Sequence, residues 1–156
     1  MAPILDPHAI LQKLSSLPIQ SYRTGETILA RGTTTGKLLV MIEGVVEVAR
    51  DGRRIAEIAE PGAVFGEMAL LLDQPHTADV RTLAPSTFYV ADGRTIVGVD
   101  SATTLYVATV LAQRLTAVNR YLVEVRTRMV ETNQPRRLFE ETLDRIGGTL
   151  RYGPPL

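Results

Sequence analysis

The residues of this sequence that are best suited to chemistry lie close together between positions 61 and 80. Gly66 and Glu67 lead into an apolar segment compatible with a short helix, and His76 and Thr77 come before a strand-like run. Glycine lets the backbone approach a ligand closely because it has no Cβ atom. The first amides of a helix lack partners within it and can point at a ligand. The stretch therefore predicts a lip around a small anion.

Other kinds of site find little support in the composition. The chain of 156 residues has no cysteine and only two histidines, His8 and His76. Disulfides, thiolate metal sites and cysteine nucleophiles are therefore excluded, and a histidine metal site lacks enough ligands. The sequence shows no acid–base pair and no nucleophile–histidine set. We expect neither a bound metal nor an enzyme.

The net charge and the hydropathy of the chain limit the kinds of partner that it can have. The 17 basic residues balance the 17 acidic ones, so electrostatics predicts no direct nucleic-acid surface. The N-terminus lacks the pattern of a signal peptide, and no stretch approaches the ~20 apolar residues that span a bilayer. We expect a cytoplasmic protein without membrane contact, and its length suits one domain.

Hydrophobic periodicity predicts the elements that position the lip. Apolar residues at helical spacing precede Pro18, which ends the first helix. From Ile19 to Val90, short β-branched runs alternate with glycines, a pattern typical of a barrel or sandwich. Asp51-Gly52 lies between two such runs and predicts a two-residue hairpin turn. The expected fold is mainly β with flanking helices.

A long helix is predicted from about Ser101 to Asn133. Apolar residues on one face alternate between spacings of four and three, which is typical of a coiled-coil seam. The seam consists of Leu111, Leu115, Val118, Leu122, Val125 and Met129. We expect this seam to form a homodimer, although the helix folding back on its own domain is the alternative. The like charges of Arg114, Arg126 and Arg128 flank the seam, so association would depend on apolar burial.

These patterns divide the chain into four parts. We expect an N-terminal helix at 1–18, the β-barrel at 19–100, the long helix at 101–133, and a short helix with a tail at 134–156. The 23 residues after Asn133 are too few for a helix-turn-helix module.

Two motifs resemble a known family. They are Phe65-Gly66-Glu67-Met68-Ala69-Leu70 and, after a short gap, Pro75-His76-Thr77-Ala78-Asp79-Val80. With the glycines of the preceding runs, they are similar to the cyclic nucleotide-binding domain of catabolite activator-type regulators, kinase regulatory subunits and cyclic-nucleotide-gated channels. The resemblance covers roughly residues 19–130.

The resemblance implies a jelly-roll-like double-stranded β-helix barrel with a long C-terminal helix, and a phosphate-binding cassette that begins at Glu67. By position, Glu67 would accept a hydrogen bond from a ribose 2′-hydroxyl. The implied ligand is a cyclic nucleotide, cAMP or cGMP, and the signal would pass through the long helix to an unknown protein partner. The ligand-contacting residues implied in this way are Phe65, Gly66, Glu67, Met68, Ala69, Leu70, His76, Thr77, Ala78 and Asn119.

His76 departs from the family pattern, because members that bind cyclic nucleotides usually have arginine there. Histidine offers one useful donor instead of a bidentate fork, and with a pKa near ~6.5 it is mostly neutral at pH 7. Two interpretations stay open. Either the site binds nucleotide more weakly and in a pH-dependent way, or the pocket is degenerate and the domain is a ligand-free scaffold. A truncated transcriptional regulator is a third hypothesis.

Overall fold

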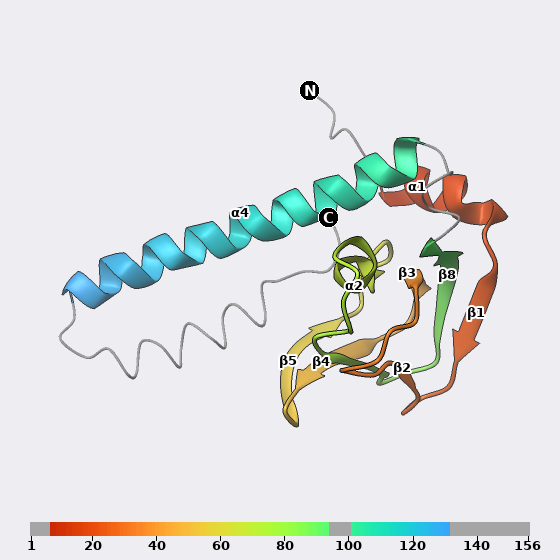
Figure 1. Cartoon of the computed structure of the whole chain (residues 1–156), viewed down its shortest axis with the longest axis horizontal. Coiled ribbons are helices and arrows are strands. Elements are labelled where there is room, and N and C mark those ends of the chain that lie inside the picture. The colour runs from red at the N-terminus through yellow and green to blue at the C-terminus, as the bar shows by residue number, and fades with distance from the viewer. Residues whose placement is uncertain (1–6, 94–100, 132–156) are drawn as a thin grey trace.

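The computed structural model describes residues 7–93 and 101–131. A short helical segment comes first, formed by α1 (Pro7–Lys13) and the 3-10 helix η1 (Leu14–Ser16). The strands are β1 (Ile19–Tyr22), β2 (Thr27–Leu29), β3 (Lys37–Glu43), β4 (Val46–Arg50), β5 (Arg53–Ile58), β6 (Val64–Phe65), β7 (Asp79–Thr82) and β8 (Ser86–Asp92). The remaining helices are α2 (Glu67–Leu71) and α4 (Ser101–Glu131). The mainly β fold with a long C-terminal helix is therefore confirmed (Figure 1).

The described strands form two antiparallel sheets of four strands each. One sheet has the order β1-β8-β3-β6 and the other β2-β7-β4-β5. The predicted hairpin is confirmed, because β4 pairs with β5 and Arg50 lies opposite Arg53. Asp51 and Gly52 both have positive φ angles, 52° and 73°, as the tight turn between twisted strands requires.

Strand β3 shows how one sheet supports two hydrophobic cores. Leu39 and Met41 belong to the cluster inside the barrel, which both sheets fill. Leu38 and Val40 belong to a second cluster, outside the barrel, with residues of α1 and α4. Because successive side chains of a strand point to opposite faces, the sheet buries one face in the barrel and the other beneath the helices.

Helix α4 is fixed to the barrel near its beginning and extends well beyond it at its far end (Figure 1). Tyr106, 1% exposed, packs in the outer cluster. Its hydroxyl donates a hydrogen bond of 2.7 Å to the carbonyl oxygen of Gly62, and burial raises the pKa of Tyr106 to about 12. Among the described residues, no helix has both the length and the hydropathy needed to cross a membrane.

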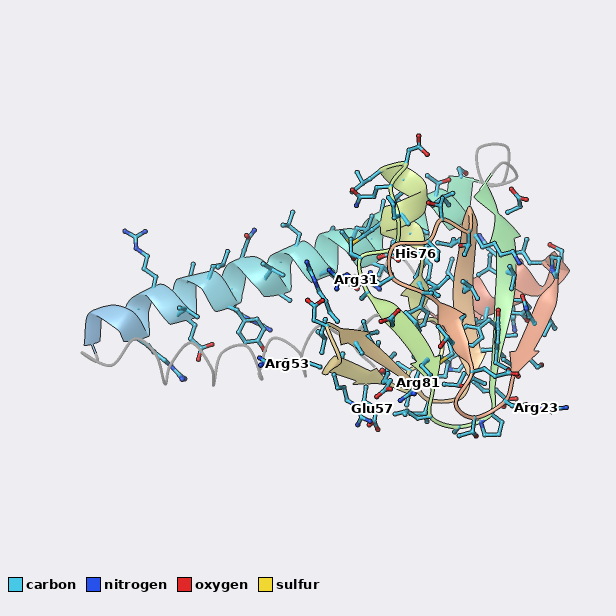
Figure 2. The ribbon with its side chains drawn as sticks, turned by 60° about the horizontal axis from the view of Figure 1, so that its bottom comes forward. Arg23, Arg31, Arg53, Glu57, His76 and Arg81 are labelled. Atoms are coloured by element: carbon cyan, nitrogen blue, oxygen red, sulfur yellow. The ribbon has the colours of Figure 1, made fainter. Side chains whose placement is uncertain are left out.

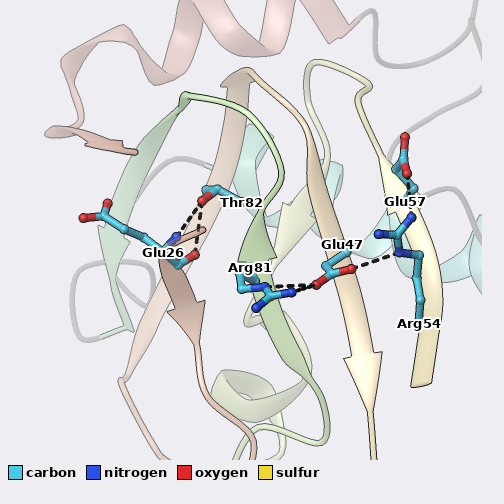
Figure 3. A network of polar contacts seen from close by, with 6 residues as sticks. All are labelled: Glu26, Glu47, Arg54, Glu57, Arg81 and Thr82. Atoms are coloured by element: carbon cyan, nitrogen blue, oxygen red, sulfur yellow. Dashed lines mark hydrogen bonds and ion pairs between the residues drawn. The ribbon is translucent and has the colours of Figure 1, made fainter. Parts of the chain in front are cut away.

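The outer face of the second sheet carries a charged network (Figure 3). Arg81 on β7 donates to Glu47 on β4 at 2.7 and 3.0 Å. Arg54 on β5 donates to the other oxygen of Glu47 at 2.9 Å and to Glu57 at 3.0 Å. Glu47 is only 7% exposed, and the hydrogen bond from Arg81 is the main reason that its pKa lies below its ordinary value of 4.5. The network thus joins three neighbouring strands.

The predicted helix at 1–18 is described from Pro7 onward, and the predicted helix and tail at 134–156 lie outside the described residues.

Candidate functional site

Gly66 makes the sharp turn from β6 into α2. Its φ is +84°, in the left-handed region that favours glycine. A Cβ atom at this position would lie 2.5 Å from the carbonyl oxygen of Lys37. Both the conformation and the space therefore require glycine, which explains why the lip begins with this residue.

The lip itself is the single turn of α2. The amide of Leu70 donates to the carbonyl oxygen of Gly66 at 3.1 Å, the first hydrogen bond within the helix. The preceding amides of Glu67, Met68 and Ala69 have no acceptor within the helix, because the first N–H groups of any helix lack one. These amides can serve as hydrogen-bond donors at the opening of the lip.

A recess lies beneath the lip, between α2 and the inner faces of the two sheets. It has a volume of about 60 Å³, enough for several water molecules. Its wall comprises Leu29, Val48, Phe65, Gly66, Glu67, Met68, Ala69, His76, Thr77, Ala78 and Val80. Eight of the predicted ligand residues are thus brought together here, all except Leu70 and Asn119. No lysine or arginine is among these wall residues.

His76 lies in the recess beside α2 (Figure 2) and is 6% exposed. Its backbone donates to Thr33 at 2.9 Å and accepts from Gly32 at 2.8 Å. Its Nε2 atom lies 3.0 Å from the hydroxyl oxygen of Thr35. Burial lowers the pKa of His76 below its ordinary value of 6.5, and the charge of Glu67 partly opposes this. At neutral pH the recess therefore contains an uncharged imidazole.

Glu67, 3% exposed, is held by a residue that the sequence did not point to. Arg114 of α4 forms an ion pair with the Oε1 atom of Glu67, and it donates a second hydrogen bond of 2.9 Å to the carbonyl oxygen of Val64. The sequence placed Arg114 among like charges that flank the seam. In the structure the side chain of Arg114 is 12% exposed and joins α4 to the lip, so its charge is paired with that of Glu67.

Two predicted ligand residues lie elsewhere. The amide of Leu70 is used within α2, and its side chain lines a different cavity, between α2 and α4. Asn119 is exposed on α4 and does not line the recess.

The predicted seam of α4 is only partly open to solvent. Leu115 is 61% exposed and Leu122 is 59% exposed, whereas Val118 and Val125 are half-buried. Leu111, at the beginning of the seam, packs against the outer cluster of the barrel. Met129, the last seam residue, lies within α4.

The groups around the recess are suited to binding. Glu67 can accept hydrogen bonds, the amides of α2 can donate them, and His76 and Thr77 add an imidazole and a hydroxyl. Within residues 7–93 and 101–131 there is no cluster of three metal-ligating side chains. The geometry defines a small-ligand site on a β-barrel, with its acceptor carboxylate bound to a long helix.

A small-ligand site on a β-barrel is also what comparison with known families indicates. Residues 19–99 match the model of the cyclic nucleotide-binding domain, so the chain belongs to this family. It is 31% identical over 88 residues to the cAMP-dependent protein kinase regulatory subunit of Yarrowia lipolytica. It is 33% identical over 76 residues to the human potassium/sodium hyperpolarization-activated cyclic nucleotide-gated channel 4.

The matched regions are small parts of those relatives. They cover 56% of this chain and 23% of the kinase regulatory subunit, and 49% of this chain and 6% of the channel. The shared part is thus a domain of much longer proteins.

Solved structures show the same relationship. The structure of PKAR CBD2 with bound Sp-2Cl-cAMPS is 25% identical and covers 60% of this chain and 63% of its own, with a TM-score of 0.53. The Thermus thermophilus catabolite activator protein is 24% identical and covers 76% of this chain and 59% of its own, with a TM-score of 0.63. The latter likeness concerns the fold.

Proposed function

We propose that this domain is a sensor that binds a cyclic nucleotide, cAMP or cGMP, in the recess beneath α2. The family and the cAMP-bound PfPKA-R structure, which is 25% identical with a TM-score of 0.51, support this class of ligand. In the proposed complex Glu67 accepts the ribose 2′-hydroxyl, and the amides of Met68 and Ala69 face the phosphate. The base extends toward α4, because the recess itself is small.

The contact between Glu67 and Arg114 is the observation on which the proposed signal depends. A ligand hydroxyl that donates to Glu67 would share its carboxylate with a side chain of α4. Binding would then favour one position of α4 over another. A ligand can shift such an equilibrium only by its difference in affinity for the two arrangements.

We further propose that the module acts as a homodimer through the seam of α4 and passes its signal to a protein partner. The exposure of Leu115 and Leu122 supports an apolar contact there. Such side chains contribute most when a second surface removes them from water.

Calorimetric titration of the full chain with cAMP and cGMP tests the binding proposal. We expect saturable heat for one of them, and binding weaker by roughly ten- to a hundredfold for the 2′-deoxy analogue, because Glu67 then loses a charge-assisted hydrogen bond. Linear 5′-AMP serves as the control ligand. Absence of heat at millimolar cAMP and cGMP would contradict the proposal.

A ligand-free scaffold is the second candidate function. It is favoured by the absence of lysine and arginine from the described wall of the recess, and by the neutral state of His76. A phosphate there would find amide donors but no formal positive charge among the described wall residues. The same titration distinguishes the two functions.

A further inference from the structure

A second cavity lies between α2 and α4, and Glu67 belongs to the walls of both cavities. Its volume is about 210 Å³, against about 60 Å³ for the recess by the same measure. Figure 1 shows α2 lying between the barrel and α4. The space between the two helices is open to solvent on one side, because Leu71 is 56% exposed and Thr104 and Ala108 are also exposed. The larger of the two cavities is therefore not the one that the family motif surrounds.

The walls of this α2–α4 cavity are apolar. Leu38 comes from β3, Leu70 and Leu71 from α2, and Val107 and Leu111 from α4. Ala108, Thr104 and Glu67 complete the wall. The carboxylate of Glu67 is already bound by Arg114. A charged ligand would therefore find no counter-ion among the described wall residues.

We propose that the α2–α4 cavity is a binding site for a small, uncharged, apolar molecule about the size of an indole ring. In another protein, an enclosed apolar cavity of about 150 Å³ binds benzene; this space is open on one side but is of comparable volume. Water gains little here because it needs two or more polar partners. An apolar ligand needs none and would remove the apolar wall from water.

Occupancy of this cavity should be coupled to the recess, an inference that rests on the proposed function. A molecule between Leu70 and Leu111 holds α2 and α4 apart. A nucleotide bound through Glu67 would instead share the carboxylate that Arg114 of α4 contacts. We therefore expect the affinities of the two sites to be coupled, and by linkage each ligand must change the affinity for the other by the same factor.

Nuclear magnetic resonance of the full chain with labelled Leu and Val methyl groups tests the site, with indole as the probe. We expect indole to shift the methyl signals of Leu70, Leu111 and Val107 saturably, whereas indole-3-carboxylate should not, because its charge has no partner. Ala108→Leu should fill the cavity and abolish these shifts. Ala112→Leu is the matched control, since Ala112 is exposed one turn farther along α4 and does not line the cavity.

The outcomes separate the two proposals. Indole binding that is lost in Ala108→Leu and kept in Ala112→Leu supports the site, even if neither cyclic nucleotide binds. Absence of saturable shifts up to the solubility limit overturns the site, even if cAMP binds. Shifts of the Leu70 and Val107 signals on dilution without indole would also overturn it, because a second copy would then fill the cavity; Leu111 is left out of this control because it also belongs to the proposed seam. Unchanged cAMP affinity at saturating indole would overturn the coupling.

Discussion

Arg114 of α4 and Glu67 of α2 form an ion pair in which both side chains are largely buried, 12% and 4% exposed. The pair joins the long helix to the lip, and Arg114 extends the connection to β6 through the carbonyl oxygen of Val64. Removing one partner of such a pair leaves the other charge buried without compensation, which is costly.

We therefore predict that Arg114→Gln lowers the free energy of unfolding by about 3–5 kcal/mol, measured by urea denaturation. Glu67→Gln should restore part of this loss when combined with it, because the unpaired carboxylate is then gone. Additive losses in the double-mutant cycle would mean that the two residues do not interact.

The origin of this pair explains what the sequence could and could not predict. The barrel and the Asp51-Gly52 hairpin follow from local signals, since alternation and turn residues act within a few positions. The partners Arg114 and Glu67 are 47 residues apart, and only the packing of α4 on the barrel brings them together. Helical periodicity shows which residues share a face of α4, but it does not show which element packs against that face.

The recess likewise combines features that the sequence predicts with features that it does not. The motif from Phe65 to Ala69 predicted the lip because its glycine and the start of its helix are local features. The contact of His76 with Thr35 involves a loop between β2 and β3, for which the sequence carries no comparable signal. The burial that lowers the pKa of His76 is likewise a property of the assembled barrel.

His76→Arg should tighten cyclic nucleotide binding. The guanidinium would supply the charge that the described wall lacks, worth about 1.5–3 kcal/mol, or roughly ten- to a hundredfold in affinity. His76→Gln is the matched control, because it keeps a neutral donor. Calorimetry that gives the same dissociation constant for the two variants would refute a phosphate near position 76.

The pH dependence of binding should follow the protonation of His76. An anionic phosphate favours the imidazolium, so the complex takes up a proton and affinity rises as the pH falls from 8 to 6. Because burial lowers the pKa of His76 below 6.5, most of the gain should come at the acid end of this range. A flat profile in the wild type, or an unchanged slope in His76→Gln, would exclude His76 as the donor.

Protonation of His76 should also affect the stability of the free protein. Lowering the pH, which strengthens nucleotide binding, should weaken the fold. The unfolded chain protonates this histidine near its ordinary pKa of 6.5, whereas the folded protein resists protonation. Below pH 6.5 the unfolded state therefore binds more protons than the folded state, so the free energy of unfolding decreases as the pH falls. Thermal unfolding between pH 7.5 and 5.5 should show this loss in the wild type and a smaller one in His76→Gln.

Glu47 should affect stability at a lower pH than His76 does. Its lowered pKa means that its contribution is complete above its ordinary value of 4.5 and is lost as the pH falls below that value through the lowered pKa. Glu47→Gln should cost about 1–3 kcal/mol at pH 7, toward the lower end because Arg54 and Arg81 are half exposed. Glu57→Gln should change stability by less than about 0.5 kcal/mol, because Glu57 is exposed and, among the described residues, is paired only with Arg54.

The seam of α4 gives the last prediction. If Leu115 and Leu122 meet a second copy, Leu115→Asp combined with Leu122→Asp places two carboxylates in an apolar contact, where a charge without a partner is strongly disfavoured. Light scattering should then give the mass of a dimer for the wild type and of a monomer for the double variant. Val123→Asp is the control, because Val123 is 65% exposed but lies off the seam. A wild-type monomer, or an unchanged mass in the double variant, would mean that α4 does not pair through these residues.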